Sequence, residues 1–355
     1  LLLIVHFLLG FRRLRDVDYY RDDPLVQRLL GLQRLPDVAT ISRTLKDMDR
    51  AGVEQLRELT RGLVLEGLQR EQFPRLTCDF DGSVISTKGH AEGTAVGFNP
   101  KNKGSRSYYS LFGTVAQTGQ FLDVLHRPGC VHDSNGAHDF MMACFEHLQA
   151  ACPAALLESR MDSAFFDRKI LNLMDLYGVE CTISVPFERL PELKRMVESR
   201  QRWRRLEGEW GYFEIDWKPK AWPAVYRFIC VRHRVRRQQK GPLQLDLFEP
   251  RDFEYDYRVI ATNKADSARH IVRFHHGRGS QEGLFGEAKQ HSGLDLIPTR
   301  RLAGNQIVTL CAMMAHNLGR ELQMRANGRD RSILAKRPAA WVFQTLDTLR
   351  HRFIQ

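Results

Sequence analysis

The segment LTCDFDGSVIST, residues 76 to 87, alternates apolar and polar residues in the manner of a buried β-strand. Because side chains alternate between the two faces of a strand, this period of two places Asp79 and Asp81 on the same face. One strand therefore offers two carboxylates side by side. Any fold of this chain must include a sheet that accommodates these acids.

A third acid follows a second apolar run. The stretch LLESRMDSAFFDRKIL predicts a short strand that ends near Asp162, then Ser163 as the cap of a helix from about 164 to 177. A carboxylate at the carboxyl end of a strand, just before a helix, lies where open α/β sheets keep their active sites. A cap or turn residue has the same signature, so Asp162 alone identifies no site.

The segment HHGRGSQEGLFGEAK, residues 275 to 289, collects charged groups on one predicted helical face. At about 100° per residue, His275, Arg278, Glu282 and Lys289 fall within roughly a 60° arc. A carboxylate flanked by three groups able to bind phosphate suits a metal-dependent enzyme acting on a phosphodiester. The simpler alternative is a solvated face with an Arg–Glu pair at i, i+4. Four glycines in this segment indicate close approach by DNA or a neighbouring backbone, or a local break in the helix.

The remaining elements predict an α/β fold. Residues 1 to 72 are expected to be helical, with Asp37 as a cap, and either contact DNA or pack as a bundle on the core. Strands are expected at 76–86, 108–116, 120–127 and 181–185, and helices at about 135–149 and 164–177. Strands followed by alternating helices and strands form a mixed α/β sheet. The opening LLLIVHFLLG is too short to span a bilayer and is expected to be a core helix; the absence of an initiator methionine suggests that residues upstream are missing.

A β-rich insertion is expected at about 186 to 262, where WGYFEIDW, VYRFICVRH and YDYRVIAT predict strands and 236–252 predicts a loop. On a strand, Arg232, Arg234 and Arg236 would share one face and could track a phosphate backbone, although charge runs are usually solvated surface. Four tryptophans offer either surfaces for stacking an unpaired base or ordinary core packing: Trp203, Trp210, Trp217 and Trp222.

Composition agrees with a nucleic-acid partner. The formal net charge is +11, which favours a polyanion, with nucleic acid first and an acidic membrane surface second. The seven cysteines show no CxxC spacing, which argues against a structural zinc site and a disulfide scaffold and fits a reducing cytosol. With 43% hydrophobic and 27% charged residues, disorder is not indicated.

Taken together, Asp81, Asp162 and Glu282 resemble the acidic triad of the DDE transposases of bacterial insertion sequences. The nearest likeness is to the branch with a Tyr-x2-Arg-x3-Glu-x6-Lys signature, which Arg278, Glu282 and Lys289 match in spacing. His275 stands in the tyrosine position and departs from the pattern, although histidine can also donate to a phosphate oxygen. The resemblance runs from about residue 15 to 325.

The family pattern in the first block is an aspartate followed by two small or hydroxyl residues. Asp81, Gly82 and Ser83 fit it better than Asp79, which is kept as the fallback ligand. The resemblance implies an RNase H-like mixed sheet with flanking helices and antiparallel first strands. It also divides the chain into an N-terminal helical region at 1–72, a first part of the catalytic core at 73–185, the β-rich insertion at 186–262, and a second part of the core at 263–355.

The implied activity is metal-dependent cleavage at transposon ends and strand transfer of a 3′-OH into target DNA. Two Mg²⁺ or Mn²⁺ ions would be held by Asp81, Asp162 and Glu282, with Arg278, Lys289 and His275 on phosphates. The partner is double-stranded DNA, bound by a homodimer in the bacterial cytoplasm, with no membrane association. The alternatives are a standalone nuclease of the same fold and an inactive DNA-binding protein derived from a transposase.

Overall fold

A computed structural model describes the chain except residues 98, 100, 133, 221, 223–225, 237–252, 333–337 and 354–355, and the side chains of 236, 253 and 353. Two compact units divide it: the first comprises Leu1–Glu158 and Arg278–Gln355, and the second comprises Ser159–Gly277. These boundaries differ from those of the four segments expected from the sequence, and that division stays a prediction. The loop expected at 236–252 lies almost wholly outside the described residues.

Helices open the first unit. They are α1 (Leu2–Leu8), the 3₁₀ helix η1 (Leu14–Tyr19), α2 (Pro24–Leu30), α3 (Val38–Asp47) and α4 (Arg50–Glu71). Asp37 caps α3 as predicted, since its side chain accepts a hydrogen bond from the Thr40 N–H at 2.7 Å. The apolar run of α1 is buried, which confirms the expected core helix. No helix in the described parts of the chain has the length and hydropathy needed to cross a bilayer.

The sheet of the first unit is built on β1 (Arg75–Thr87), which carries Asp79 and Asp81. It pairs antiparallel with β3 (Arg106–Val115), and Asp81 lies opposite Phe112 in that register. The strands β2 (Ala95–Val96) and β4 (Gln120–Leu125) pair antiparallel with β3 in turn. The expected strands and their antiparallel pairing are therefore confirmed, while β2 was not predicted.

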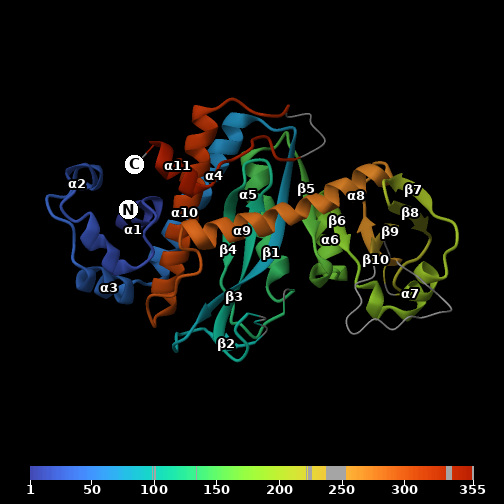
Figure 1. Cartoon of the computed structure of the whole chain (residues 1–355), viewed down its shortest axis with the longest axis horizontal. Helices are drawn as coiled ribbons and strands as arrows, with labels where there is room; N and C mark the ends of the chain where they lie inside the picture. The colour runs from blue at the N-terminus through green and yellow to red at the C-terminus, as the bar shows by residue number, and fades with distance from the viewer. Residues whose placement is uncertain are drawn as a thin grey trace. The chain divides into compact units, whose positions relative to one another are not determined.

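Helices cover this sheet and fill the core of the first unit. They are α5 (Ala137–Ala151), α9 (Ser280–His291), α10 (Leu302–Ala326) and α11 (Leu346–Phe353). Phe112, Phe121 and Phe285 bring β3, β4 and α9 into one apolar cluster, which also includes buried residues of α10. In Figure 1, α9 lies across β1, and α11 is close to α1; Arg350 Nε donates to the Leu8 carbonyl at 2.7 Å.

The strand β5 (Leu156–Met161) contributes Leu156 to Glu158 to the first unit and its remaining residues to the second. The second unit continues with the 3₁₀ helices η2 (Ser163–Phe165) and η3 (Phe187–Arg189), α6 (Arg168–Leu176), β6 (Glu180–Ser184), α7 (Pro191–Glu198), β7 (Arg204–Glu207), β8 (Trp210–Ile215), β9 (Arg227–Arg236), β10 (Phe253–Thr262) and α8 (Ala268–His276). The strands from β6 onward are ordered β6-β10-β9-β8-β7, and each strand in this order is antiparallel to its neighbours.

The three strands expected in the insertion are confirmed as β8, β9 and β10, which lie side by side in Figure 1. Ile229, Val231 and Ile260 of this sheet pack against Ile271 and Val272 of α8 in the apolar core of the second unit. The strand β7 was not predicted. All seven cysteines are free.

Candidate active site

Asp81 is the acid of β1 that solvent can reach. Its side chain is 19% exposed, whereas Asp79, two residues earlier on the same face, is 1% exposed. One oxygen of Asp81, Oδ1, accepts the Gly82 N–H at 2.8 Å, and the other, Oδ2, lies 3.5 Å from Nη1 of Arg278. A metal ligand must be accessible to the ion, so these environments favour Asp81 over the fallback Asp79.

The signature segment is not one continuous helix, and the prediction of a single helical face for its four charged residues is wrong. The helix α8 ends at His276, a 3₁₀ turn η4 spans Gly277–Gly279, and α9 begins at Ser280. Glycine weakens a helix because it loses the most backbone freedom on ordering. The sequence alternative of a local break is therefore confirmed, and the break lies at the first two of the four glycines.

Three side chains tie α9 to the sheet of the first unit. Arg278, just before the helix, pairs with Asp81, as described above. Gln281 Nε2 donates to the Asp79 carbonyl at 3.1 Å and to Thr114 Oγ1 at 2.9 Å, and Lys289 Nζ donates to the Val84 carbonyl at 2.9 Å. These contacts place α9 on β1, with its first turn near the two aspartates.

Glu282 lies in that first turn and is exposed. Lys289, two turns later, is half-buried, and burial lowers its pKa below the usual value; Asp295 opposes this shift and Lys101 adds to it. The structure thus gives Lys289 a contact with the backbone of β1 that its predicted phosphate role did not include.

Asp162 belongs to the second unit and follows the last residue of β5. Its carboxylate caps η2 by accepting the Ala164 N–H at 3.0 Å. The expected cap Ser163 is wrong, because Asp162 takes that place and Asp167 caps the α-helix that follows, α6. The helix expected from 164 consequently begins only at Arg168. Both readings of Asp162, a cap and a strand-end acid, describe its position.

His275 is buried in the second unit and contacts two hydroxyl groups. Its Nδ1 lies 3.0 Å from Thr182 Oγ1, and its Nε2 lies 2.8 Å from Ser184 Oγ, both on β6. With a hydroxyl at each ring nitrogen, the imidazole packs as an internal polar side chain. This arrangement offers neither nitrogen to a phosphate, so the phosphate role expected from its place in the signature has no support in these contacts.

The acids have the right chemistry for a hard cation, because carboxylate oxygens are the ligands that Mg²⁺ and Mn²⁺ prefer. Within the described residues, however, no three or more His, Cys, Asp or Glu side chains form a group that could hold a metal ion. In the first unit, Asp81 and Glu282 are supplied by two elements that contact each other, β1 and α9. The donor types therefore fit a divalent metal.

The basic residues of β9 lie among aromatic rings. The Arg232 guanidinium is 4.8 Å from the Trp203 ring centre and 4.4 Å from that of Tyr255, and Arg234 lies 4.0 Å from Glu209. The side chain of Arg236 lies outside the described residues. The four tryptophans are half-buried, and each contacts a ring of its own chain: Trp203 on Phe213, Trp210 on His233, Trp217 on Phe228 and Trp222 on Phe166. These contacts favour packing over base stacking.

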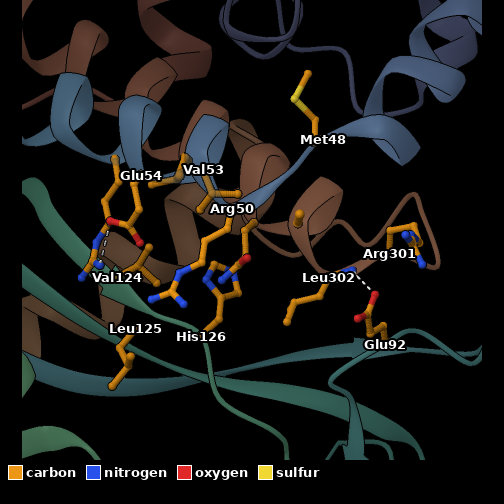
Figure 2. Close-up of a pocket in the computed structure, with 14 residues that line it drawn as sticks. Met48, Arg50, Val53, Glu54, Glu92, Val124, Leu125, His126, Arg301 and Leu302 are labelled. Carbon is orange, nitrogen blue, oxygen red and sulfur yellow. Dashed lines mark hydrogen bonds and ion pairs between the residues drawn. The ribbon is translucent and has the colours of Figure 1, made fainter.

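A separate pocket of about 510 Å³ opens in the first unit between α4, β4 and the start of α10 (Figure 2). Glu92 Oε2 accepts the N–H of Leu302 at its rim, and His126 lies on its floor. Burial, with a smaller contribution from the charge of Arg57, lowers the pKa of His126 to about 4, so its ring is neutral. None of the acids or cations expected from the sequence lines this pocket.

Gln281 is the residue that sequence reasoning missed. It occupies a variable position of the signature, and its type suggests no chemistry. The available signal was spacing, since Gln281, Phe285 and Ala288 recur at i, i+4 and i+7 and are the buried residues of α9. A polar residue on the apolar face of a helix indicates a specific hydrogen-bond partner in the core.

The chain is thus an α/β protein that carries acids on β1, at the end of β5 and in the first turn of α9. The family model described as transposase DDE domain group 1 matches residues 2–355. The chain belongs to that family. It is thus a DDE transposase, an enzyme of metal-dependent DNA cleavage and strand transfer, as the resemblance implied.

Among solved structures, the chain is similar to a piggyBac transposase in a synaptic complex with hairpin DNA. The TM-score is 0.51 at 11% identity, over 95% of this chain and 67% of that one. A Mos1 transposase paired-end complex matches with a TM-score of 0.23 at 13% identity, over 46% of this chain and 55% of that one. The first match shows the fold and confirms the predicted α/β class. No curated protein matches the sequence.

Proposed function

We propose that this transposase cleaves DNA at the ends of a bacterial insertion sequence and joins the freed 3′-OH to target DNA, with Asp81, Asp162 and Glu282 as catalytic acids. The observation that carries the assignment is the ion pair between Arg278 and Asp81. It joins the signature segment to the strand of the first acid, although the two are far apart in the sequence. Glu282 follows Arg278 by about one helical turn.

The three acids would hold two Mg²⁺ or Mn²⁺ ions, which supply activation of the attacking oxygen and stabilisation of the leaving oxygen when bound. The protein's own contribution is to hold these carboxylates in place. Gly82 donates its N–H to Asp81, and Glu282 lies in the first turn of α9. The fallback Asp79 is too deeply buried for this role.

Arg278 is proposed to bind the scissile phosphate, because a guanidinium matches a phosphate with two parallel hydrogen bonds. It already faces Asp81, and so a phosphate near that acid would be within its reach. Lys289 adds positive charge along the same helix. His275 is proposed only as a support of the segment, since both of its ring nitrogens contact hydroxyl groups of β6.

Arg232, Arg234 and Arg236 are proposed to contact the DNA backbone outside the reacting phosphodiester. The net charge of +11 supports a polyanionic partner, and the similar piggyBac and Mos1 structures are complexes with DNA or transposon ends. Action as a homodimer on transposon ends and location in the bacterial cytoplasm complete the proposal. Salt should weaken binding, because each phosphate contact releases counterions.

The decisive experiment incubates a linear duplex carrying the element's own ends with Mg²⁺ or Mn²⁺ and compares the intact protein with Glu282→Ala. Loss of cleavage with retained duplex binding is the expected result. Glu58→Ala, which removes an exposed carboxylate of α4, is the matched control and should cleave normally. Equal cleavage by the intact protein and Glu282→Ala would remove Glu282 from the mechanism.

The same assay separates the alternatives. Cleaved ends that are never joined to a target duplex would indicate a standalone nuclease. Binding without cleavage under either metal would indicate an inactive transposase derivative.

A further inference from the structure

We infer that Gln281 is a positioning residue: its carboxamide fixes the first turn of α9 on β1 and β3 and thereby sets the place of Glu282. The inference rests on the proposed function, in which Glu282 is a metal ligand. It assigns a task to a glutamine whose place in the signature is otherwise variable.

The contact geometry is specific. Gln281 is 2% exposed, and its Nε2 donates to the Asp79 carbonyl at 3.1 Å and to Thr114 Oγ1 at 2.9 Å. Asp79 and Thr114 are register partners on β1 and β3, and the Thr114 hydroxyl itself lies 3.4 Å from the same carbonyl. Both partners are oxygens, and the carbonyl only accepts. The nitrogen of the carboxamide must therefore face the sheet.

These bonds act on Glu282 through the helix. Gln281 and Glu282 are consecutive, so their side chains leave α9 about 100° apart. With Gln281 held inward against β1, Glu282 has to project toward the exposed side of the first turn. Arg278 anchors the residues just before this turn to Asp81, two residues along β1 from the carbonyl that Gln281 binds. The contacts of Arg278 and Gln281 together fix the position of this turn on β1 and its rotation about the helix axis.

Stability alone does not explain this glutamine. Its Oε1 is buried and has no hydrogen-bond partner among the described residues. A buried oxygen without a partner is unfavourable, so an apolar side chain of similar size would remove a penalty together with the two bonds. Gln281→Leu is therefore expected to fold with little change in Tm, whereas the position of Glu282 loses its constraint.

The test measures Mn²⁺ binding directly, from the electron paramagnetic resonance signal of free Mn²⁺, with the full chain bound to its end duplex. Gln281→Leu should raise the Mn²⁺ concentration for half-saturation about fivefold to tenfold, the effect of roughly one or two lost hydrogen bonds. The same shift should appear in the Mn²⁺ dependence of cleavage. Duplex affinity should stay within about twofold, because α9 would remain folded.

Matched variants separate positioning from folding. Thr114→Val removes one acceptor at constant shape and should shift Mn²⁺ binding in the same direction, whereas Thr114→Ser keeps the hydroxyl and should not. Gln290→Leu changes an exposed glutamine of the same helix and should behave as the intact protein. A lowered Tm with unchanged Mn²⁺ binding in both Gln281→Leu and Thr114→Val would overturn the inference, since it would leave only a structural role.

Failure of the proposed function looks different. If Glu282→Ala binds Mn²⁺ and cleaves as the intact protein does, Glu282 is no ligand and the proposed site is wrong. If Glu282→Ala abolishes both and Gln281→Leu alters neither, the site stands and the positioning role of Gln281 is overturned.

Discussion

Arg278 and Asp81 form an ion pair, with Nη1 3.5 Å from Oδ2 and about a fifth of each side chain exposed. They lie on different elements, η4 and β1, and this pair joins the start of α9 to β1. Because the pair is partly buried, solvent and salt screen its attraction less than that of a surface ion pair. Removal of the ion pair should therefore disturb both the position of α9 and the electrostatic environment of Asp81.

Arg278→Ala should lower the rate of end cleavage at least about tenfold, because Asp81 loses the guanidinium beside it and the phosphate loses a bidentate donor. Arg278→Lys should recover only part of the rate, since an ammonium group provides charge without the planar fork. Single-turnover cleavage of the end duplex measures both. Arg325→Ala, at a mostly exposed arginine of α10, is the control. Full activity of Arg278→Ala would contradict the assignment.

Arg160 leaves no room for a side chain at Gly277, and both residues belong to the second unit. A Cβ at this position would lie 2.3 Å from Nη1 of Arg160, which is 1% exposed and donates to the Phe274 carbonyl at 3.3 Å. Gly277→Ala should cost about 1–3 kcal/mol of unfolding free energy, because the buried guanidinium has little room to move. In an Arg160→Met background the same substitution should cost less. Urea unfolding of the intact protein, the two single variants and the double variant gives the coupling free energy between the two positions. If the two changes in unfolding free energy simply add, the predicted clash is refuted.

A buried charge cluster holds α4 to β4. The side chain of Asp123 is 0% exposed and accepts from Arg57 Nε at 2.6 Å and from Arg61 Nη1 at 3.0 Å. Asp123→Asn should destabilise the first unit by about 3–5 kcal/mol, because two arginines lose their counter-charge. Glu54→Gln, at the more exposed partner of Arg57, should cost well under about 1 kcal/mol. Comparable urea midpoints for the two variants would count against this view of the cluster.

Acid should destabilise the protein through histidines that are buried as neutral rings. Burial, aided by the charge of Arg320 and opposed by a hydrogen bond to the Gly119 carbonyl, lowers the pKa of His316 to about 3. The unfolded chain takes up this proton near pH 6.5, so the stability is complete above that value and is lost as the pH falls toward 3. The loss between pH 7 and pH 5 should be about 2 kcal/mol for this residue.

The check is the dependence of Tm on pH for the intact protein and His316→Gln. The variant should show a flatter dependence between pH 7 and pH 5, whereas His351→Gln, at an exposed histidine, should follow the intact protein. His6 and His126, with pKa values lowered to about 4, should keep some slope in every variant. Identical slopes for all three proteins would rule out His316 as a contributor.

Gly283 and Gly286 test whether DNA approaches the backbone of α9. Both are exposed, and a Cβ at either would meet nothing within 4 Å. Alanine should therefore stabilise the helix by about 0.5–1 kcal/mol at each position. If DNA packs closely there, Gly283→Ala should cleave its duplex more slowly despite a higher Tm. Unchanged cleavage would speak against close approach at this position.

Much of the fold was predictable because its signals are local. Alternation located β1, aromatic and β-branched residues located β8 to β10, and Asp37 indicated the start of α3. The errors arose where two local signals competed. Asp162 rather than Ser163 became the cap, since either side chain can accept a helix N–H and only the path of the backbone decides between them.

The site was predictable in its residue types but not in its surroundings. Spacing alone gave one face for His275 and Arg278, and it could not show that the glycines end α8 or that β6 supplies two hydroxyl groups to the imidazole. Gln281 escaped because its partners, a backbone carbonyl and Thr114, are about 200 and 167 residues away in the chain. Contacts between residues so far apart in the chain produce no periodic pattern in the sequence.

Two of the twelve residues of α9 are glycine. The free energy of helix formation is therefore about 2 kcal/mol less favourable than for the same segment with alanine at both positions. A synthetic peptide covering Ser280–His291 should consequently be a random coil in water, as short helices generally are. The ordered conformation of α9, which carries Glu282, therefore depends on the contacts that Gln281 and Lys289 make with the sheet. Under the proposed function, local melting of α9 would displace Glu282 and abolish activity without global unfolding.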